Sequence, residues 1–200
     1  MEKVIIFDFD NTLYNGNVWN DWYNYMTKFL NTYFVYEKAK NNFINKYVNA
    51  EYLDDRYICE GLIKENGTSQ PLIDYLIENP YEYNGENITF IDNEYLKQLS
   101  KKHHLYIVSN TPSNTIRIAL KKYGVDDKYF KDIFFNAKTN LQVSKKDWYE
   151  KIMQLENVEN SDVIVIGDSY LSDIKPAQQL GTKYLQVSSL KDIYNHNFEE

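Results

Sequence analysis

Two carboxylates, Asp8 and Asp10, stand one residue apart directly after a short apolar run at 4–7. The run predicts a buried strand that carries both acids at its carboxyl end. In open parallel α/β sheets, ligands bind at that end of the strands. Because a buried carboxylate without a partner is costly, we expect a compensating positive charge, such as a bound cation, beside these acids.

Two more apolar runs, at 105–108 and 163–166, also end in polar residues. These residues carry hydroxyl, amide and carboxylate groups: Ser109, Asn110 and Thr111 after the first run, and Asp168 with Asp173 after the second. Neither run alternates apolar with polar residues, which is typical of parallel strands covered on both faces. The three strand ends are therefore expected at the same edge of one sheet.

The grouped side chains suit phosphoryl chemistry. Carboxylates from neighbouring strand ends favour a hard divalent cation, and Mg²⁺ is the natural choice. A hydroxyl and backbone N–H groups at the start of a helix favour a phosphate. Lys145 and Lys146 lie just before another expected helix, where a cation could neutralise that phosphate.

Strands and helices alternate along the segments that position these residues. Weaker strands are expected at 132–135 and 183–187, and helices at 92–102, 114–123, 147–155 and 173–180. This alternation predicts right-handed crossovers and a doubly wound, mostly parallel α/β sheet.

A long segment after the first strand follows a different pattern. It lacks a comparable β-branched run, and its apolar residues recur at helical spacing: Trp19, Trp22, Met26, Phe29 and Tyr33, then Ala39, Phe43 and Tyr47. Further helices are expected at 53–64 and 71–78. We therefore predict a small all-helical domain at 15–84 and an α/β core domain made from 1–14 and 85–200.

The composition limits the class of protein. The 200 residues are 43% hydrophobic and 26% charged, which indicates a globular chain of one or two units. A net charge of −7 argues against a nucleic-acid polymer as partner. One cysteine excludes a disulfide scaffold, and no signal or membrane segment is visible, so we expect a cytoplasmic location without a membrane partner. The sequence does not set an oligomeric state.

Four segments, in order, resemble the motifs of the haloacid dehalogenase (HAD) superfamily. They are Asp8-Phe9-Asp10-Asn11-Thr12-Leu13, Ser109-Asn110-Thr111, Lys145-Lys146 and Gly167-Asp168-Ser169-Tyr170-Leu171-Ser172-Asp173-Ile174. The likeness is to the phosphatase branch with a helical cap inserted after the first motif. It implies a Rossmann-like HAD core and a catalytic site at the strand ends.

The resemblance implies a role for each acid. Asp8 would be the nucleophile that forms an aspartyl-phosphate, and Asp10 would protonate the leaving oxygen and then activate water. The Asp8 carboxylate, the Asp10 backbone carbonyl and Asp168 would hold Mg²⁺. Asp173 would act from behind these ligands, on metal-bound water or on the lysine.

The phosphate-binding residues implied by the resemblance are Ser109, the N–H group of Asn110, and one lysine. The lysine of this family is commonly followed by proline, whereas here Lys145 is followed by Lys146. We favour Lys145, with Lys146 as the alternative, because Asp147 then falls where the helix cap is expected.

The function that we expect from this resemblance is Mg²⁺-dependent hydrolysis of a small phosphomonoester. A nucleoside 5′-monophosphate or a sugar phosphate fits best, and the helical insert would close over the site as a cap. Tyr14, Asn15 and Trp19 follow the first motif closely enough to line the cleft and contact the substrate.

Three alternatives remain beside the phosphatase. A phosphomutase or phosphotransferase of the same superfamily would differ in details of the cap. A 2-haloacid dehalogenase would use the same aspartate to attack carbon, but that chemistry needs neither Asp10 nor Asp168. A receiver-like phosphoaspartate switch, which is not an enzyme, would carry its phosphorylated aspartate where this chain has Ser109, and it lacks a large helical insert.

Overall fold

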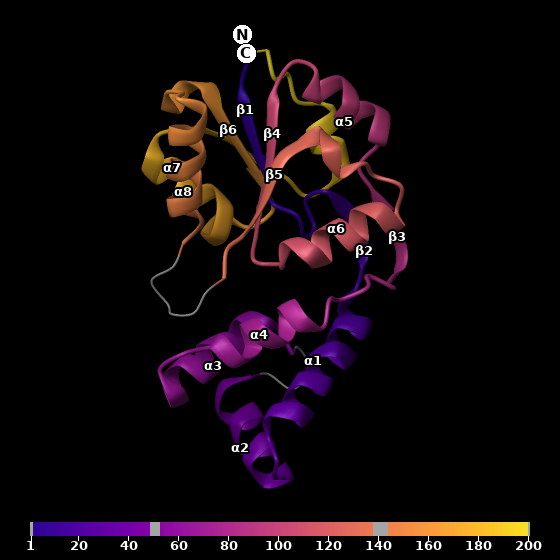
Figure 1. Ribbon diagram of the computed structural model, residues 1–200, viewed down its shortest axis with the longest axis vertical. Coiled ribbons are helices and arrows are strands. Elements are labelled where there is room, and N and C mark those ends of the chain that lie inside the picture. Colours follow the sequence, from indigo (N-terminus) through magenta and orange to yellow (C-terminus); the bar gives the residue numbers. More distant parts are fainter. Residues whose placement is uncertain (1, 49–52, 138–143, 200) are drawn as a thin grey trace. The chain divides into compact units, whose positions relative to one another are not determined.

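The computed structural model describes residues 2–48, 53–137 and 144–199, and Figure 1 shows its elements. The chain divides into two compact units. The first, called the core unit, contains the chain up to Gly16, the stretch Asn87–Asn136, and the chain from Ser144 onward. The second, called the helical unit, is mainly Asn17–Glu86.

The core unit is built on a five-stranded sheet in the order β5-β4-β1-β6-β7. All its neighbouring strands are parallel. The strands are β1 (Val4–Phe7), β4 (His104–Ser109), β5 (Phe130–Phe135), β6 (Val163–Gly167) and β7 (Lys183–Gln186). This confirms the predicted doubly wound α/β class. It also places β1 in the centre, with Phe7 opposite Ile107 of β4 and Ile166 of β6.

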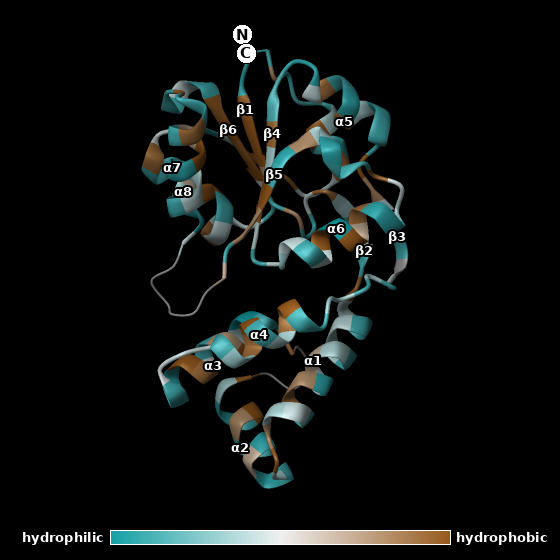
Figure 2. Cartoon of the chain, in the orientation of Figure 1, coloured by the Kyte–Doolittle hydropathy of each residue, from teal (hydrophilic) through white to brown (hydrophobic). Residues whose placement is uncertain are grey.

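Helices cover both faces of this sheet (Figure 1), which explains why its central strands are apolar throughout (Figure 2). They are α5 (Asn93–Ser100) and α6 (Ser113–Lys122) on one side, and α7 (Lys145–Glu156) and α8 (Lys175–Leu180) on the other. On the α7 side, Ile6 and Val165 of the sheet pack with Ile152 and Ala177 of the helices. The central strands are buried along their whole length.

Two elements near the strand ends differ from the prediction. Helix α7 begins at Lys145, and its cap is Ser144, whose side chain accepts the Lys146 N–H at 3.0 Å. The prediction that Asp147 caps this helix is therefore wrong. A π-helical turn, η3 (Tyr170–Ile174), precedes α8, whereas the sequence predicted a helix beginning only at Asp173.

The described residues of the helical unit form α1 (Trp19–Tyr33), α2 (Glu37–Tyr47), α3 (Asp55–Asn66) and α4 (Gln70–Glu78). Their apolar faces meet in one buried cluster that includes Met26, Phe29, Leu30, Phe43, Ile58, Leu62, Leu72 and Leu76. Gly61 allows α2 and α3 to approach, because a Cβ there would lie 2.7 Å from the Phe43 ring. Trp19, at the start of the predicted apolar stripe, is 50% exposed and lies outside this cluster.

The chain enters the helical unit through β2 (Tyr14–Asn17) and returns through β3 (Glu86–Phe90), and these strands pair as a two-stranded sheet. Neither strand was predicted. Gly16 has a φ of +145°, and a Cβ there would lie 2.8 Å from the Ile88 Cα, so the close approach of the two strands requires glycine.

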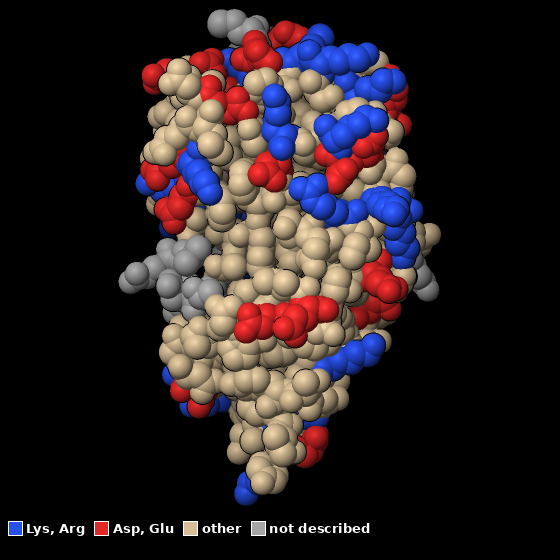
Figure 3. Space-filling view, in the orientation of Figure 1, with Lys and Arg blue, Asp and Glu red and all other residues tan. Residues whose placement is uncertain are grey.

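Charged side chains are interspersed over the core unit on the face drawn in Figure 3, with basic and acidic residues side by side. Throughout the described ranges, every helix is too short or too polar to span a bilayer. Two 3₁₀ turns, η1 (Asp127–Tyr129) and η2 (Asn160–Asp162), and a short helix, α9 (Leu190–Tyr194), complete the core unit.

Candidate active site

Strand β1 delivers Asp8 to the carboxyl edge of the sheet. The Asp8 N–H continues the strand pairing by donating to the Ile166 carbonyl at 2.8 Å. The register therefore sets Asp8 beside Gly167, the residue before Asp168. The two acids come from neighbouring strands, as the sequence predicted.

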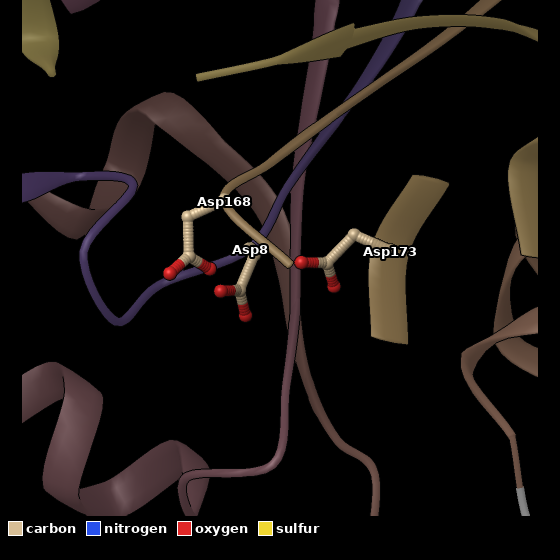
Figure 4. A group of neighbouring side chains, drawn as sticks. All are labelled: Asp8, Asp168 and Asp173. Carbon is tan, nitrogen blue, oxygen red and sulfur yellow. The ribbon is translucent and has the colours of Figure 1, made fainter. Parts of the chain in front are cut away.

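Three carboxylates meet at this edge: Asp8, Asp168 and Asp173 (Figure 4). One oxygen of each lies within 4.8 Å of the other two. Figure 4 shows Asp8 between the other two residues, with the carboxylates turned toward one another. This grouping concentrates negative charge in a largely buried place.

Asp173 reaches the group because the end of β6 is a glycine. A Cβ on Gly167 would lie 2.5 Å from the Cβ of Asp173, which no ordinary contact allows. The Ser169 N–H donates to Asp173 Oδ2 at 3.1 Å and fixes the turn that carries the acid. Asp173 is completely buried as a result.

Lys145 supplies the compensating charge. Its Nζ lies 2.6 Å from Asp8 Oδ1 and 2.6 Å from Asp173 Oδ1, and the residue is only 3% exposed. Lys146, the alternative left by the sequence, instead pairs with Glu150 at 2.8 Å on α7 and is partly exposed. Of the two lysines, Lys145 is the one that lies among the acids.

Burial and charge act in opposite directions on these groups. Burial raises the pKa of Asp8 above its ordinary value, and Lys145 opposes that shift. Burial disfavours charge on Lys145, but Asp8 and Asp173 outweigh it and raise the lysine pKa, so the ammonium stays protonated. Burial, and then the nearby Asp173, raises the pKa of Asp168. The three described acids outnumber the one ammonium among them, so full ionisation of the group is unfavourable until a further cation binds.

The donor set fits Mg²⁺, since carboxylate oxygens are hard ligands and a bound cation would favour the ionised form of these acids. Both oxygens of Asp173 already accept hydrogen bonds, one from Lys145 and one from Ser169. Asp8 and Asp168 are thus better placed to bind the ion, with Asp173 holding the lysine. The side chain of Asp10 lies outside the carboxylate group. Binding by its backbone carbonyl stays a prediction.

The Asp10 carboxylate has partners that the sequence did not predict. The Tyr14 hydroxyl donates to Asp10 Oδ1 at 3.0 Å, and the Thr111 hydroxyl donates to Asp10 Oδ2 at 2.6 Å. Tyr14 returns to Asp10 because the chain turns sharply after Phe9, with Asn11 at a φ of +55°. The residue pattern carries no signal for this contact, because residues 10–14 are not helical.

The end of β4 is held by a network around Ser109. Its hydroxyl accepts the Thr111 N–H at 3.1 Å, and its carbonyl accepts the Asn136 N–H at 2.7 Å. The side chain of Asn136 donates to Asn110 Oδ1 at 2.9 Å. The sequence did not predict that Asn136 lies at this site. The loop that was predicted to bind phosphate is thereby braced by the end of β5.

The three residues predicted to contact substrate have different surroundings. Tyr14 is 1% exposed, and its ring lies against Phe90. The Asn15 side chain accepts a long, 3.4 Å hydrogen bond from the Leu190 N–H in the core unit. Trp19 is half exposed at the start of α1. A substrate contact by any of them stays a prediction.

A parallel sheet with an acid pair after its central strand, and a buried lysine among the neighbouring acids, defines a hydrolase of the HAD type. The family model of haloacid dehalogenase-like hydrolases matches residues 5–187. The chain therefore belongs to this family.

Solved structures share this fold. They include the HAD-hydrolase YfnB from Bacillus subtilis bound to magnesium, 19% identical over 96% of this chain and 97% of that one, with a TM-score of 0.54. A predicted phosphoglycolate phosphatase from Haemophilus somnus is also 19% identical, over 92% and 84%, with a TM-score of 0.58. A HAD phosphatase from Thermococcus onnurineus is 15% identical over 96% of each chain, with a TM-score of 0.55. No curated protein sequence matches significantly.

Proposed function

We propose that the protein is a Mg²⁺-dependent phosphatase that hydrolyses a small phosphomonoester, with Asp8 as the nucleophile. The observation that carries the proposal is the contact of Asp8 with Lys145, 2.6 Å apart among the acids at the carboxyl end of the central strand. A buried carboxylate next to a fixed ammonium suits attack on an anionic phosphoryl group, because the ammonium offsets the charge that both reactants bring.

In the first half of the proposed reaction, an Asp8 oxygen attacks phosphorus in line with the bond to the leaving oxygen. That bond breaks as Asp10 gives its proton to the leaving oxygen. The products are an alcohol and an aspartyl-phosphate on Asp8, which divides one difficult hydrolysis into two easier steps.

In the second half, a water oxygen attacks the phosphorus of the aspartyl-phosphate. Asp10, now a carboxylate, takes the proton of that water, and the Asp8 oxygen leaves phosphorus. Such acid–base help typically contributes roughly 10² to 10⁴ in rate. Lys145, the Ser109 hydroxyl and the Asn110 N–H would hold the phosphoryl oxygens throughout.

The residues proposed to hold Mg²⁺ are Asp8 and Asp168, with the Asp10 backbone carbonyl. When bound, the ion supplies positive charge that polarises the phosphoryl group. The carboxylate group of this chain supports that assignment, and YfnB, which has the same fold, was determined bound to magnesium. Asp173 would keep Lys145 oriented.

The substrate class that we propose is a nucleoside 5′-monophosphate or a sugar phosphate, with residues of the helical unit selecting the leaving group as a cap. The structural neighbour from Haemophilus somnus is described as a phosphoglycolate phosphatase, another enzyme for a small phosphomonoester. A phosphomutase or phosphotransferase would differ by passing the phosphoryl group to an acceptor alcohol and not to water.

A phosphate-release screen with Mg²⁺ tests the proposal. The wild-type protein should release inorganic phosphate from at least one nucleotide or sugar phosphate. Asp8→Asn should reduce release to background, because an amide cannot take over the nucleophilic role. Asp132→Asn, which changes an exposed aspartate on β5, is the matched control and should keep full activity.

Several outcomes would contradict the proposal. An Asp8→Asn variant with a tenth of the wild-type activity would show that Asp8 is not the nucleophile. Undiminished phosphate release in excess chelator would show that the reaction does not need Mg²⁺. Halide release from a 2-haloacid without any phosphate release would make the protein a dehalogenase. Circular dichroism of each variant checks that the fold is retained.

A further inference from the structure

We infer that Tyr14 and Thr111 are positioning residues that hold the Asp10 carboxyl group in the orientation needed for proton transfer. The inference rests on the proposed phosphatase reaction, in which Asp10 is the general acid and base. It assigns a role to two hydroxyl groups that the reaction itself does not use.

The contacts restrain Asp10 from two sides. The Tyr14 hydroxyl lies 3.0 Å from Oδ1, and the Thr111 hydroxyl lies 2.6 Å from Oδ2. One partner, Tyr14, is the first residue of β2, and the other, Thr111, lies in the segment after β4. Because each oxygen is held by a different segment, rotation of the carboxyl group would stretch both bonds.

The two hydroxyl groups are themselves held in place. The Tyr14 ring is buried and stacks on Phe90 with 5.2 Å between ring centroids. It also contacts the Phe9 ring at 5.7 Å. Thr111 is 8% exposed, and its N–H donates to the Ser109 hydroxyl at 3.1 Å. A positioning residue must be rigid, and these contacts provide that rigidity.

Hydroxyl partners suit a carboxyl group that gains and loses a proton. A hydroxyl can donate to a carboxylate and can also accept from a carboxylic acid, whereas an ammonium can only donate. Asp10 is held by two hydroxyl groups, while Asp8 is held by the ammonium of Lys145. The two acids of the first motif therefore have different kinds of partner. This agrees with their proposed roles, Asp8 as nucleophile and Asp10 as general acid and base.

The test uses two phosphomonoesters whose leaving groups differ in their need for a proton. Phenyl phosphate releases a basic oxygen that needs protonation, whereas 4-nitrophenyl phosphate releases an anion that leaves without it. We measure kcat/KM with Mg²⁺ for the wild-type protein, Tyr14→Phe and Thr111→Val. Each variant should lose roughly ten-fold or more on phenyl phosphate and less than about three-fold on 4-nitrophenyl phosphate. Thr111→Ser, which keeps a hydroxyl, should recover most of the loss.

Two matched controls remove the same chemical groups elsewhere. Tyr106→Phe deletes a tyrosine hydroxyl that donates to the carboxylate of Glu156, outside the proposed site. Thr115→Val deletes a buried hydroxyl that has no hydrogen-bond partner among the residues that the structure describes. Both controls should leave the ratio of the two kcat/KM values at its wild-type level.

The outcomes separate this inference from the proposed function. If the wild-type protein released phosphate but Tyr14→Phe lost activity equally on both esters, the positioning role would be wrong and the phosphatase would stand. If the wild-type protein released no phosphate from any ester, both the positioning role and the proposed phosphatase function would be wrong. Tyr14→Phe keeps the buried ring, so it decides the question even if Thr111→Val does not fold.

Discussion

Lys145 is both buried and charged, and burial normally disfavours the charged form of a lysine. Its ammonium group is almost inaccessible to water, yet it remains charged because Asp8 and Asp173 each lie 2.6 Å from it. Breaking such a buried pair leaves an uncompensated charge and costs about 3–5 kcal/mol. The residue that is proposed to bind phosphate is therefore also expected to support the fold.

Lys145→Met should accordingly lose activity and stability together. The free energy of unfolding should fall by about 3–5 kcal/mol, because two buried carboxylates would lose their partner. Lys146→Met, a matched change at the next residue, should leave the urea midpoint unchanged, since Lys146 pairs with Glu150 at the surface. Equal urea midpoints for both variants would show that the buried pair adds no stability.

At the residue scale, the sequence predicted which acids come together, and it favoured Lys145 over Lys146 as the lysine of the site. Asp8, Asp168 and Asp173 follow strand ends that could be recognised from their apolar runs. Contacts that depend on the exact path of a turn could not be predicted in this way. The bonds to Asp10 from Tyr14 and Thr111 arise from the positive φ of Asn11 and from the loop after β4, which leave no mark in the residue pattern.

At the scale of elements, β4 and the end of α7 are joined through Glu156. Tyr106 donates to this carboxylate, and His104 Nδ1 lies 2.6 Å from it, while the other His104 nitrogen faces Glu2 at 3.0 Å. Burial favours the protonated acid, but the bonds from Tyr106 and His104, with the nearby charge of Lys131, lower the pKa of Glu156 below its ordinary value.

This shift predicts a pH-dependent contribution to stability. Because the folded-state pKa lies below the unfolded value of 4.5, the stabilisation is complete above about pH 4.5. It is lost as the pH falls through the lower, folded-state pKa. Glu156→Gln should therefore reduce the free energy of unfolding at pH 7 by about 1 kcal/mol, and the difference from wild type should shrink in acid. Urea unfolding at several pH values measures both, and a difference that does not change with pH would contradict the assignment.

The helices and strands themselves were predictable where burial leaves a clear apolar pattern in the sequence. Strands β1, β4 and β6 are covered on both faces, so their apolar runs were sufficient evidence. Strand β2 reads Tyr-Asn-Gly-Asn and is exposed after Tyr14, so its pairing with β3 has no apolar pattern to reveal it. Helix α9 has five residues, which is too short for a helical period to be visible.

At the scale of the whole molecule, the proposed site draws on four separate stretches of the chain. The residues that meet follow β1, β4 and β6 or begin α7, so ligand binding and folding of the core unit should be linked. A ligand that binds only the folded state raises stability by mass action, by about 2.7 kcal/mol at a hundred times its Kd.

Mg²⁺ should consequently raise the temperature of thermal unfolding of the wild-type protein in a concentration-dependent manner. Asp168→Asn should reduce this rise, because it removes one of the proposed ligands. Asp132→Asn should behave as wild type. An equal rise in Asp168→Asn and wild type would indicate that the ion binds elsewhere.

The fold class was the most predictable property, since the alternation of strands and helices is spread over the whole chain and tolerates local errors. The position of the helical insert could be expected from a change in periodicity. The substrate could not be predicted, because the sequence carries no motif that specifies one phosphomonoester.

The pairing of β2 with β3 has a consequence for how proteins of this kind could diversify. An insert whose two ends leave from paired strands can be lengthened, shortened or exchanged without rerouting the backbone of the domain that carries it. The sheet and its acids could then be inherited unchanged while the inserted helices vary. If the inserted helices select the substrate, as proposed, exchange of the insert would change the specificity and leave the reaction chemistry intact.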